Sequence, residues 1–241
     1  MKNVQSQSPG KNSSWPEFLK QKRNEVKHPV LKNYYSSIPL TQNISLHNAR
    51  FVALDFETTG LDSRVDGIVS IGLVPFDLDR IYCNESGYWL VNPQQPLTEE
   101  SIAIHGLTHT DLAAAPDLGS VYESLLSAMT GRIVVVHYHH IERSFLNQAL
   151  QSHLGEGIHF PVVDTMVIEA RLRDRKPRSI WHALRGRKPR SIRLIDCRNR
   201  YGLPHYQSHH ALTDAIATAE LLQAQVAHHF DKSIPLAQLV V

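Results

Sequence analysis

The sequence has few cysteines and no long hydrophobic run, and each of these deficits excludes a class of protein. Two cysteines among 241 residues are too few for a disulfide-stapled domain or a cysteine-rich zinc module. No apolar stretch approaches the roughly 20 residues that a membrane span requires. Residues 1–20 are polar and lack the apolar core of a secretory signal. We therefore expect a cytoplasmic protein that makes no membrane contact.

The small net charge of +2 conceals a strongly basic segment. Residues 171–200, called the basic strip below, hold 12 of the 25 Lys and Arg against two acids. The rest of the chain carries eight more acids than bases. A basic strip on an acidic body favours a polyanionic partner beside a carboxylate-rich site. A solvated insertion would give the same count, and charge alone leaves both interpretations open.

The basic strip contains a local duplication, because RKPRSI at residues 175–180 recurs unchanged at residues 187–192. One repeat cannot build a solenoid, which needs several stacked units. Proline flanked by cations predicts an extended basic loop, either a phosphate contact or a tolerated surface insertion. If the strip follows phosphates, neutralising Arg187, Lys188 and Arg190 should weaken binding evenly across sequences and flatten its salt dependence.

The hydrophobic pattern predicts an N-terminal helical extension, residues 1–48, followed by a mixed α/β domain, residues 49–241. Short links between the first strands favour antiparallel pairing. The later alternation of helices and strands predicts helices covering a mixed sheet. Predicted strands are 51–56, 68–76, 80–83, 87–91, 132–137 and 160–163, and predicted helices are 16–27, 31–35, 117–130, 141–154, 165–173 and 211–230.

Two carboxylates, Asp55 and Glu57, end the first predicted strand of the domain. Side chains two residues apart on a strand point to the same face, so both acids converge. Like charges repel and burial favours the neutral forms, and a divalent cation removes both penalties. Oxygen ligands suit Mg²⁺ or Mn²⁺ rather than zinc. A solvated strand end is the alternative for an isolated pair of acids.

Three further residues can extend this pair. Glu142 opens a predicted helix, where the helix dipole alone favours an acid. Asp214 adjoins the apolar face of the closing helix and reaches the first strand if that helix packs on it. His209 lies five residues earlier, about 140° away on an ideal helix, so it joins the site only from a loop or first turn.

Two other short segments are interpreted as structural rather than functional. Asp164 and Thr165 follow a predicted strand and are expected to cap the next helix. His105 and Gly106 lie between apolar residues, so a turn is the simplest interpretation and substrate contact is the alternative.

Together these segments resemble the DEDDh, or DnaQ-like, family of 3′–5′ exonucleases, and especially the epsilon-type proofreading exonucleases of bacteria. The likeness covers about residues 49–230 and implies a ribonuclease H-like fold, a mixed five-stranded sheet with helices on both faces. The matching segments, in order, are FVALDFETTGL at 51–61, IHGLT at 104–108, VVHYHHIERSFL at 135–146, VDT at 163–165 and HHALTDA at 209–215.

The resemblance implies a metal-dependent cleavage of phosphodiester bonds. Two Mg²⁺ or Mn²⁺ ions about 4 Å apart would clamp the scissile phosphate. Asp55 would bridge the ions, and Glu57 and Asp214 would complete the first site. Glu142 would support the second ion through water.

The resemblance also implies roles in water activation and substrate binding. His209 would be the general base for the attacking water. Thr58, Gly60 and His105 would contact the terminal nucleotide. The products would be nucleoside 5′-monophosphates released from the 3′ end of DNA.

The second motif departs from the family pattern. Family members have Asp where this chain has Glu142, preceded by a small Asn-Ala pair where it has Tyr138 and His139. The longer carboxylate must retract or act through water, and the bulkier pair narrows the site. The chain ends 27 residues after Asp214, so we expect a free-standing exonuclease rather than a stable polymerase subunit.

Two alternatives to a DNA exonuclease stay open. The first alternative is an exonuclease that prefers RNA or short oligonucleotides. No sequence feature recognises the 2′-hydroxyl, so the sequence does not distinguish this alternative from a DNA exonuclease. A catalytically weak nucleic-acid-binding protein is the second, and it predicts salt-sensitive binding without metal-dependent turnover.

Overall fold

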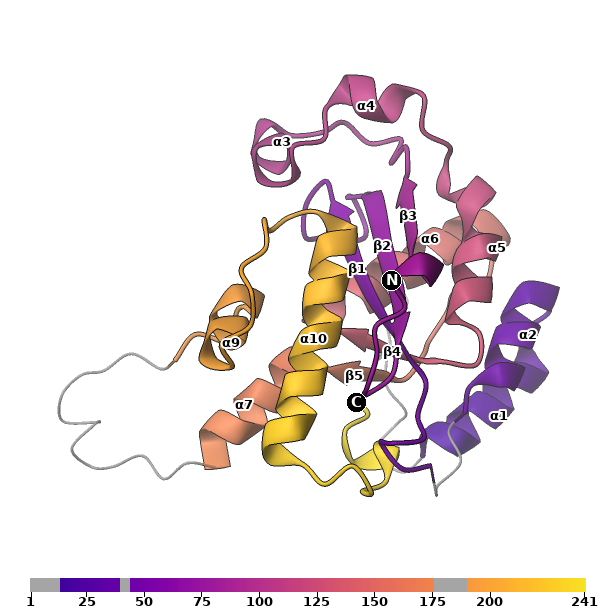
Figure 1. Ribbon diagram of the computed structural model, residues 1–241. Coiled ribbons are helices and arrows are strands. Elements are labelled where there is room, and N and C mark those ends of the chain that lie inside the picture. The colour runs from indigo at the N-terminus through magenta and orange to yellow at the C-terminus, as the bar shows by residue number, and fades with distance from the viewer. Residues whose placement is uncertain (1–13, 40–43, 176–189) are drawn as a thin grey trace.

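The computed structural model describes residues 14–39, 44–175 and 190–241 (Figure 1). A mixed five-stranded sheet has the order β3-β2-β1-β4-β5, which confirms the predicted sheet. β1 pairs antiparallel with β2, and β2 with β3, whereas β4 and β5 continue the sheet in parallel. The strands are β1 (Phe51–Thr58), β2 (Ile68–Phe76), β3 (Gly87–Leu90), β4 (Ile133–Val136) and β5 (Val162–Asp164).

Helices cover both faces of the sheet, as predicted. Buried side chains of α1, α2, α5 and α6 fill the core on one face, and those of α7 and α10 fill the core on the other. The helices are α1 (Trp15–Glu25), α2 (Pro29–Ser37), α3 (Glu99–His105), α4 (His109–Ala113), α5 (Leu118–Met129), α6 (His140–Leu154), α7 (Thr165–Arg175), α9 (Leu194–Arg200) and α10 (Ala211–His229), with 3₁₀ turns η1 (Cys83–Glu85) and η2 (Leu236–Gln238).

The alternation of β1 decides which side chains face α10. Val52 and Leu54 enter the core beneath α5 and α6, whereas Phe51 and Ala53 enter the core beneath α10. Asp55 and Glu57 continue the second series, because strand side chains alternate with a period of two. The two acids therefore project from the α10 face of the central strand.

A glycine lets α10 lie directly on the sheet. Gly72 of β2 is opposite Asp55 in the strand register. A Cβ atom at Gly72 would lie 2.1 Å from the carbonyl carbon of Ala211, the first residue of α10. Figure 1 shows α10 lying across β1 and β2, with its N-terminal end at this level. The missing side chain thus allows the N-terminus of α10 to approach β1 closely.

The predicted strand at residues 80–83 is wrong. Ile81 makes only an isolated bridge to Phe76, and the chain then enters η1. The carboxylate of Asp77 accepts hydrogen bonds from the backbone N–H groups of Asp79 and Arg80. This side-chain-supported turn ends β2 and prevents a further strand from forming.

The predicted turn at His105 and Gly106 is the end of a helix. Thr98 caps α3 by accepting from the backbone N–H of Ser101 at 3.1 Å. His105 occupies the last turn, and Gly106 ends the helix in the left-handed conformation with φ of 75°. Helices α3, α4 and α9 were absent from the predicted elements.

The N-terminal helices pack against the sheet through α5 and α6. The Glu156 carboxylate, just beyond α6, accepts from the backbone N–H groups of Lys27 and His28 between α1 and α2. The division into residues 1–48 and 49–241 stays a prediction. Residues 176–189, which include Arg187 and Lys188, lie outside the described residues, so most of the predicted basic loop does too.

The sequence contains no run long enough for a membrane span, and the described helices of the structure agree with this expectation. Within the described ranges, no helix combines the length and the hydrophobicity that crossing a bilayer requires.

Candidate active site

The end of β1 and the start of α10 bring three potential ligand groups together. Glu57 lies near the end of β1, Asp214 lies in the first turn of α10, and His209 precedes that helix. One ligand atom from each of these residues lies within 4.8 Å of the other two. The close seating of α10 on Gly72 produces this convergence across more than 150 residues of sequence.

His209 reaches the site from outside the helix. It lies two residues before Ala211 and has a left-handed backbone with φ of 67°. Its backbone N–H donates to Oδ2 of Asp214 at 2.7 Å. His209 and Asp214 are therefore not separated by the angle expected on a continuous helix. The His209 imidazole shares the site with the Glu57 and Asp214 carboxylates.

Asp55 has the most unfavourable electrostatic position in the site. Burial raises the pKa of Asp55 well above its usual range, and the Glu142, Asp214 and Glu57 carboxylates raise it further. Burial, followed by repulsion from Asp214, raises the pKa of Glu57 to about 7. Burial also raises the pKa of Asp214. Four acids thus converge where each disfavours the ionisation of another.

Glu142 joins the cluster from the first turn of α6. Its side chain is only 2% exposed, and burial raises its pKa. Its Oε2 atom has no hydrogen-bond partner within the part of the chain that the structure describes. An orphaned buried oxygen facing other carboxylates fits a divalent cation with oxygen ligands, which would neutralise the repulsion.

Asp164 holds the backbone that leads into α6. Its carboxylate accepts from the backbone N–H of His139 at 2.8 Å and lies 2.6 Å from Nδ1 of the same residue. It also accepts from Met166 at the start of α7, so the predicted capping role is confirmed. Burial alone would raise the pKa of Asp164, but these hydrogen bonds outweigh it and lower the pKa to about 2.

The two bulky residues of the second motif have separate environments. His139 is engaged by Asp164, whereas Tyr138 is 45% exposed and has a φ of 91°. Such a conformation is strained for a side chain of this size. The N–H of Tyr138 donates to Asp164 at 3.3 Å, which helps to hold the strained residue.

The predicted substrate-binding residues surround the same end of β1. The hydroxyl of Thr58 donates to the carbonyl of Gly60 at 2.6 Å and closes the turn after β1. Nδ1 of His105 accepts from the N–H of Leu107, so the ring proton of the neutral form lies on Nε2. This buried Nε2 has no hydrogen-bond partner among the described residues.

His105 lies close to His209, although it belongs to a helix outside the sheet. Burial lowers the pKa of His105, and the neighbouring His209 lowers it further. A buried donor for which the described ranges offer no acceptor thus lies beside His209, the predicted general base.

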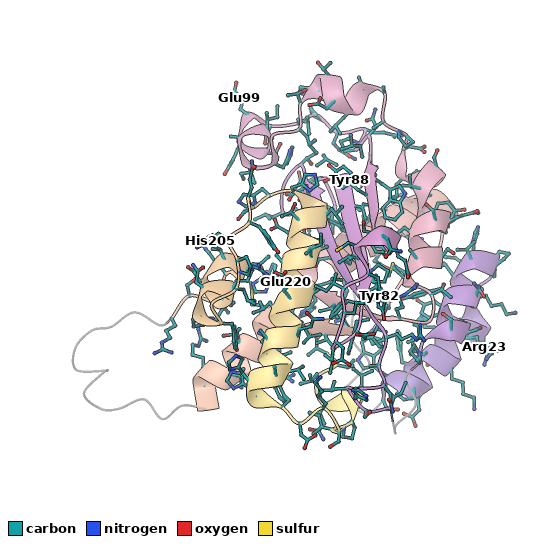
Figure 2. The ribbon with its side chains drawn as sticks, viewed as in Figure 1. Arg23, Tyr82, Tyr88, Glu99, His205 and Glu220 are labelled. Carbon is teal, nitrogen blue, oxygen red and sulfur yellow. The ribbon has the colours of Figure 1, made fainter. Side chains whose placement is uncertain are left out.

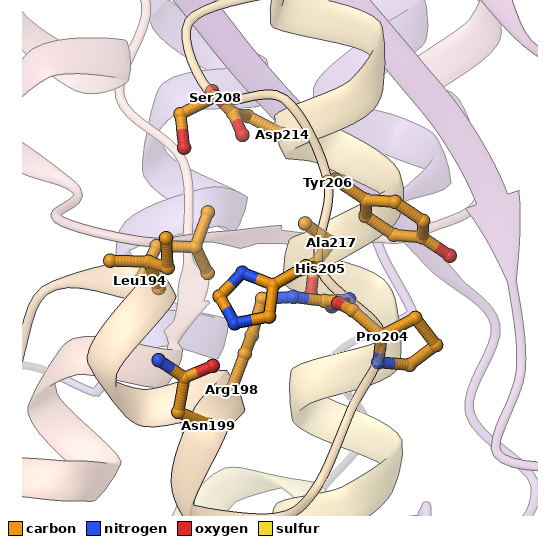
Figure 3. Close-up of a pocket in the computed structure, with 10 residues that line it drawn as sticks. Leu194, Arg198, Asn199, Pro204, His205, Tyr206, Ser208, Asp214 and Ala217 are labelled. Carbon is orange, nitrogen blue, oxygen red and sulfur yellow. Dashed lines mark hydrogen bonds between the residues drawn. The ribbon is translucent and has the colours of Figure 1, made fainter.

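Sequence analysis missed a pocket that extends from Asp214 toward α9 (Figure 3). Its floor is Arg198, a buried guanidinium that lies 2.7 Å from the Glu220 carboxylate and 4.7 Å from the centre of the Tyr206 ring. Asn199, His205 and Ser208 also line the pocket. No local sequence signal marks these residues, because the pocket requires α9 to pack against α10.

His137 was also missed as a structural link. Its Nδ1 lies 2.8 Å from the hydroxyl of Thr165, and its Nε2 lies 2.9 Å from the carbonyl oxygen of Ile192. Burial lowers the pKa of His137. This ring joins the end of β4 to the chain segment that leads into α9.

Comparisons with known proteins agree with this arrangement. The RNase T family, described as exonuclease, matches residues 52–222. A PolC-type DNA polymerase III of Thermotoga petrophila is 30% identical over 193 residues, which cover 80% of this chain and 12% of that protein. The epsilon subunit of DNA polymerase III from Treponema pallidum is 28% identical over 179 residues, with coverage of 74% and 77%.

A solved structure shows the same fold. Exonuclease X in complex with 5′-overhanging duplex DNA superposes with a TM-score of 0.58 at 23% identity, covering 78% of this chain and 98% of that one. The resemblance to DEDDh exonucleases and the ribonuclease H-like fold are thereby confirmed. The chain spans only 12% of the length of PolC-type relatives to which it is similar.

Proposed function

The chain belongs to the RNase T family of exonucleases, and we propose on this basis that it degrades DNA from the 3′ end. The products would be nucleoside 5′-monophosphates. The observation that carries this proposal is the convergence of four acids and one imidazole at the end of the central strand. These residues are Asp55, Glu57, Glu142, His209 and Asp214.

The acids are suited to hold two divalent ions, and Mg²⁺ or Mn²⁺ matches their oxygen atoms. Asp55 is close enough to Glu57, Glu142 and Asp214 for each of them to raise its pKa, and it would serve as a ligand for both ions. Glu57 and Asp214 would complete one site, and Glu142 would support the other. When bound, the ions would polarise the scissile phosphate and stabilise the charge on the leaving 3′ oxygen.

His209 is proposed as the general base. Its ring shares a 4.8 Å cluster with oxygen atoms of Glu57 and Asp214, so a water beside these carboxylates is within reach of an imidazole nitrogen. The imidazole would take the proton from this water as it attacks phosphorus. The hydrogen bond from the His209 backbone to Asp214 holds the two residues in one arrangement.

The terminal nucleotide is proposed to bind beside His105, Thr58 and Gly60. Nε2–H of His105 can donate to an oxygen of the substrate, which would satisfy a buried donor that has no acceptor in the described part of the chain. The solved structures of the same fold include exonuclease X with duplex DNA and a 3′-exonuclease that recognises a histone mRNA stem-loop. The proposed preference for DNA is therefore supported by the sequence relatives, which are DNA polymerase III proteins.

The proposal is tested by incubating the protein with 5′-labelled single-stranded DNA in Mg²⁺, in Mn²⁺ or in EDTA. We expect a ladder that shortens from the 3′ end with either metal and is absent in EDTA and in Asp55→Ala. The matched control is Asp79→Ala, which removes an exposed acid paired with Lys232 and should retain full activity.

A second set of lanes contains an RNA of the same sequence. Faster shortening of the RNA would show that the protein is an RNA-directed exonuclease. DNA binding without shortening under any metal condition would overturn the proposed activity.

A further inference from the structure

The part of the loop that carries His209 is exposed. Residues 204–210 are all solvent-exposed, and they connect α9 to the first residue of α10. A general base needs a fixed position relative to the water that it activates. The described contacts identify aromatic side chains that hold this loop near both of its ends.

Tyr206 holds the first part of the loop. Its hydroxyl donates to the Glu220 carboxylate at 2.8 Å, and its ring lies over the guanidinium of Arg198. Glu220 also pairs with Arg198 at 2.7 Å. Figure 3 shows Tyr206 and Arg198 among the residues that line the pocket, with Asp214 and Arg198 toward opposite ends of it. The loop is therefore attached to the middle of α10 three residues before His209.

Tyr88 holds the last part of the loop from a distant strand. Its ring stacks on the ring of His210 with centroids 4.7 Å apart and an interplanar angle of 15°. His210 is also the N-cap of α10, where its Nδ1 accepts from the N–H of Thr213 at 3.4 Å. The imidazole is thus held on one face by a phenol ring and at one edge by the helix.

The sheet register aligns Tyr88 with the catalytic strand. Tyr88 pairs with Gly72, and Gly72 pairs with Asp55, so the three residues lie in one row across β3, β2 and β1. The absence of a side chain at Gly72 leaves room for α10 between Tyr88 and Asp55. Burial raises the pKa of Tyr88, and the nearby Glu57 carboxylate raises it further.

His209 lies between the two attachments in a conformation that needs support. A left-handed backbone is strained for a residue other than glycine, and φ of His209 is 67°. Fixing the ring of His210 fixes the peptide that joins it to His209. A change in the position of His210 would therefore move the imidazole of His209 relative to Glu57 and Asp214.

We propose that Tyr88 is a positioning residue, which holds His209 in register with the carboxylates by stacking on His210. This inference rests on the proposed exonuclease function, in which His209 is the general base. The stack uses the face of the ring, so the phenol hydroxyl is not required for it.

The activity test compares Tyr88→Leu with Tyr88→Phe. Leu removes the aromatic face and should lower kcat on single-stranded DNA at least tenfold with little change in KM, whereas Phe should retain kcat within about twofold. Tyr82→Leu is the matched control, because Tyr82 is a tyrosine of the same strand-rich region whose hydroxyl donates to Asp77 and not to the loop that carries His209. Figure 2 labels both tyrosines and shows them at different levels of the sheet. An unchanged thermal midpoint would show that Tyr88→Leu remains folded.

A spectroscopic test does not require activity. Protein carrying ¹³C-labelled histidine rings is compared by NMR, with His209 and His210 assigned from His209→Gln and His210→Gln. Removing the Tyr88 ring should move the His210 ring protons downfield and broaden or shift those of His209. Tyr88→Phe should leave both sets of resonances near their wild-type positions.

The outcomes separate this inference from the proposed function. An active wild type with full kcat in Tyr88→Leu would overturn the positioning role and leave the exonuclease intact. A wild type without activity would overturn the exonuclease, and the His209 resonances alone would then decide whether Tyr88 holds the loop. Unchanged His209 resonances in Tyr88→Leu would overturn the inference in either case.

Discussion

Asp55 has neighbours that make the metal-free site unfavourable. The pKa values of Asp55 and Glu57 are raised by burial and by other acids, so folding brings together groups that repel one another. A residue selected for folded stability alone would not be an acid here. The repulsion that destabilises the empty site is the property that attracts a divalent cation.

We predict that Asp55→Asn stabilises the metal-free protein while abolishing its activity. Removing the central charge relieves the repulsion, so unfolding in EDTA should require about 1 kcal/mol more free energy. Mg²⁺ at 100 times its dissociation constant should stabilise the wild type by about 2.7 kcal/mol and Asp55→Asn by much less. Thermal unfolding with and without Mg²⁺ measures both effects.

The control for this prediction is Asp79→Asn, an exposed acid at the opposite end of the sheet. It should change neither the stability in EDTA nor the stabilisation by Mg²⁺. A loss of stability in Asp55→Asn under metal-free conditions would contradict the role of repulsion.

We predict that Asp164→Asn lowers stability at neutral pH and that this difference fades in acid. The native pKa of about 2 lies below the ordinary value, so the ionised carboxylate stabilises the fold above about pH 4. This contribution is lost as the pH falls toward 2. The shift corresponds to about 2 kcal/mol, and the group is 1% exposed. Urea unfolding of both proteins at pH 7, 4 and 2.5 measures the gap.

The pH dependence of that gap is the decisive quantity. A gap that stays constant from pH 7 to pH 2.5 would show that the charge of Asp164 is unimportant. The helix-capping geometry alone would then explain its effect.

At the scale of secondary-structure elements, the contact between α10 and β2 positions Asp214. We predict that Gly72→Ala destabilises the protein by at least about 2 kcal/mol and lowers activity more than tenfold. The new methyl group would meet the backbone of Ala211 at 2.1 Å, and backbone cannot rotate away as a side chain can. Chemical unfolding and the DNA-shortening assay measure the two losses.

Gly119→Ala provides the matched control. It lies in α5, and its new Cβ would approach the flexible ring of His153 at 3.1 Å. Its stability should stay within about 1 kcal/mol of the wild type, because alanine is the better helix former. Equal losses in both variants would show that the close seating of α10 is not specific to Gly72.

Elements with a strong hydrophobic period were predictable from the sequence. The predicted strand at residues 68–76 coincides with β2, and the closing helix differs from α10 by one residue at its end. In both, burial follows directly from an uninterrupted pattern of apolar residues. The helix α9 was not predictable, because its buried Arg198 resembles a solvated charge until Glu220 and Tyr206 are brought to it.

The candidate site was predictable where it follows local geometry. The period of a strand places Asp55 and Glu57 on one face, and the apolar face of α10 directs Asp214 toward them. His209 approaches the carboxylates because its own backbone is left-handed, and the spacing of apolar residues in a helix does not predict such a conformation. The stack of Tyr88 on His210 depends on strand register and on the seating of α10, and both arise only in the folded chain.

At the scale of the whole molecule, charge is segregated away from the acidic site. The exposed cations Arg190 and Arg193 lie at the described end of the basic strip. The N-terminal helices, whose Arg23 is labelled in Figure 2, lie on the opposite side of the molecule. Exposed cations therefore lie on both sides, and variants on each side can show which of them attracts a partner with many phosphates.

We predict that neutralising Arg187, Lys188 and Arg190 together weakens binding of single-stranded DNA equally for different sequences. The slope of log affinity against log salt should fall in magnitude by about 2, as expected for three lost phosphate contacts. Fluorescence anisotropy between 50 and 200 mM salt measures this slope with a catalytically inactive Asp55→Ala background.

Neutralising Lys20, Arg23 and Lys27, three exposed cations of the N-terminal helices, removes the same charge from the opposite side. This control should leave the slope nearly unchanged. Equal changes in both triple variants would indicate that only net charge matters and that the basic strip has no particular role.

The two margins of the sheet have consequences for self-association. The backbone of Val241 exchanges hydrogen bonds with Val162, and Val240 bridges to Val163, so chain covers the outer margin of β5. The other margin, β3, is only four residues long. Unpaired strand margins are templates for intermolecular pairing and aggregation. Exposing β5 would therefore create a new nucleus for aggregation on the side of the sheet farthest from Tyr88.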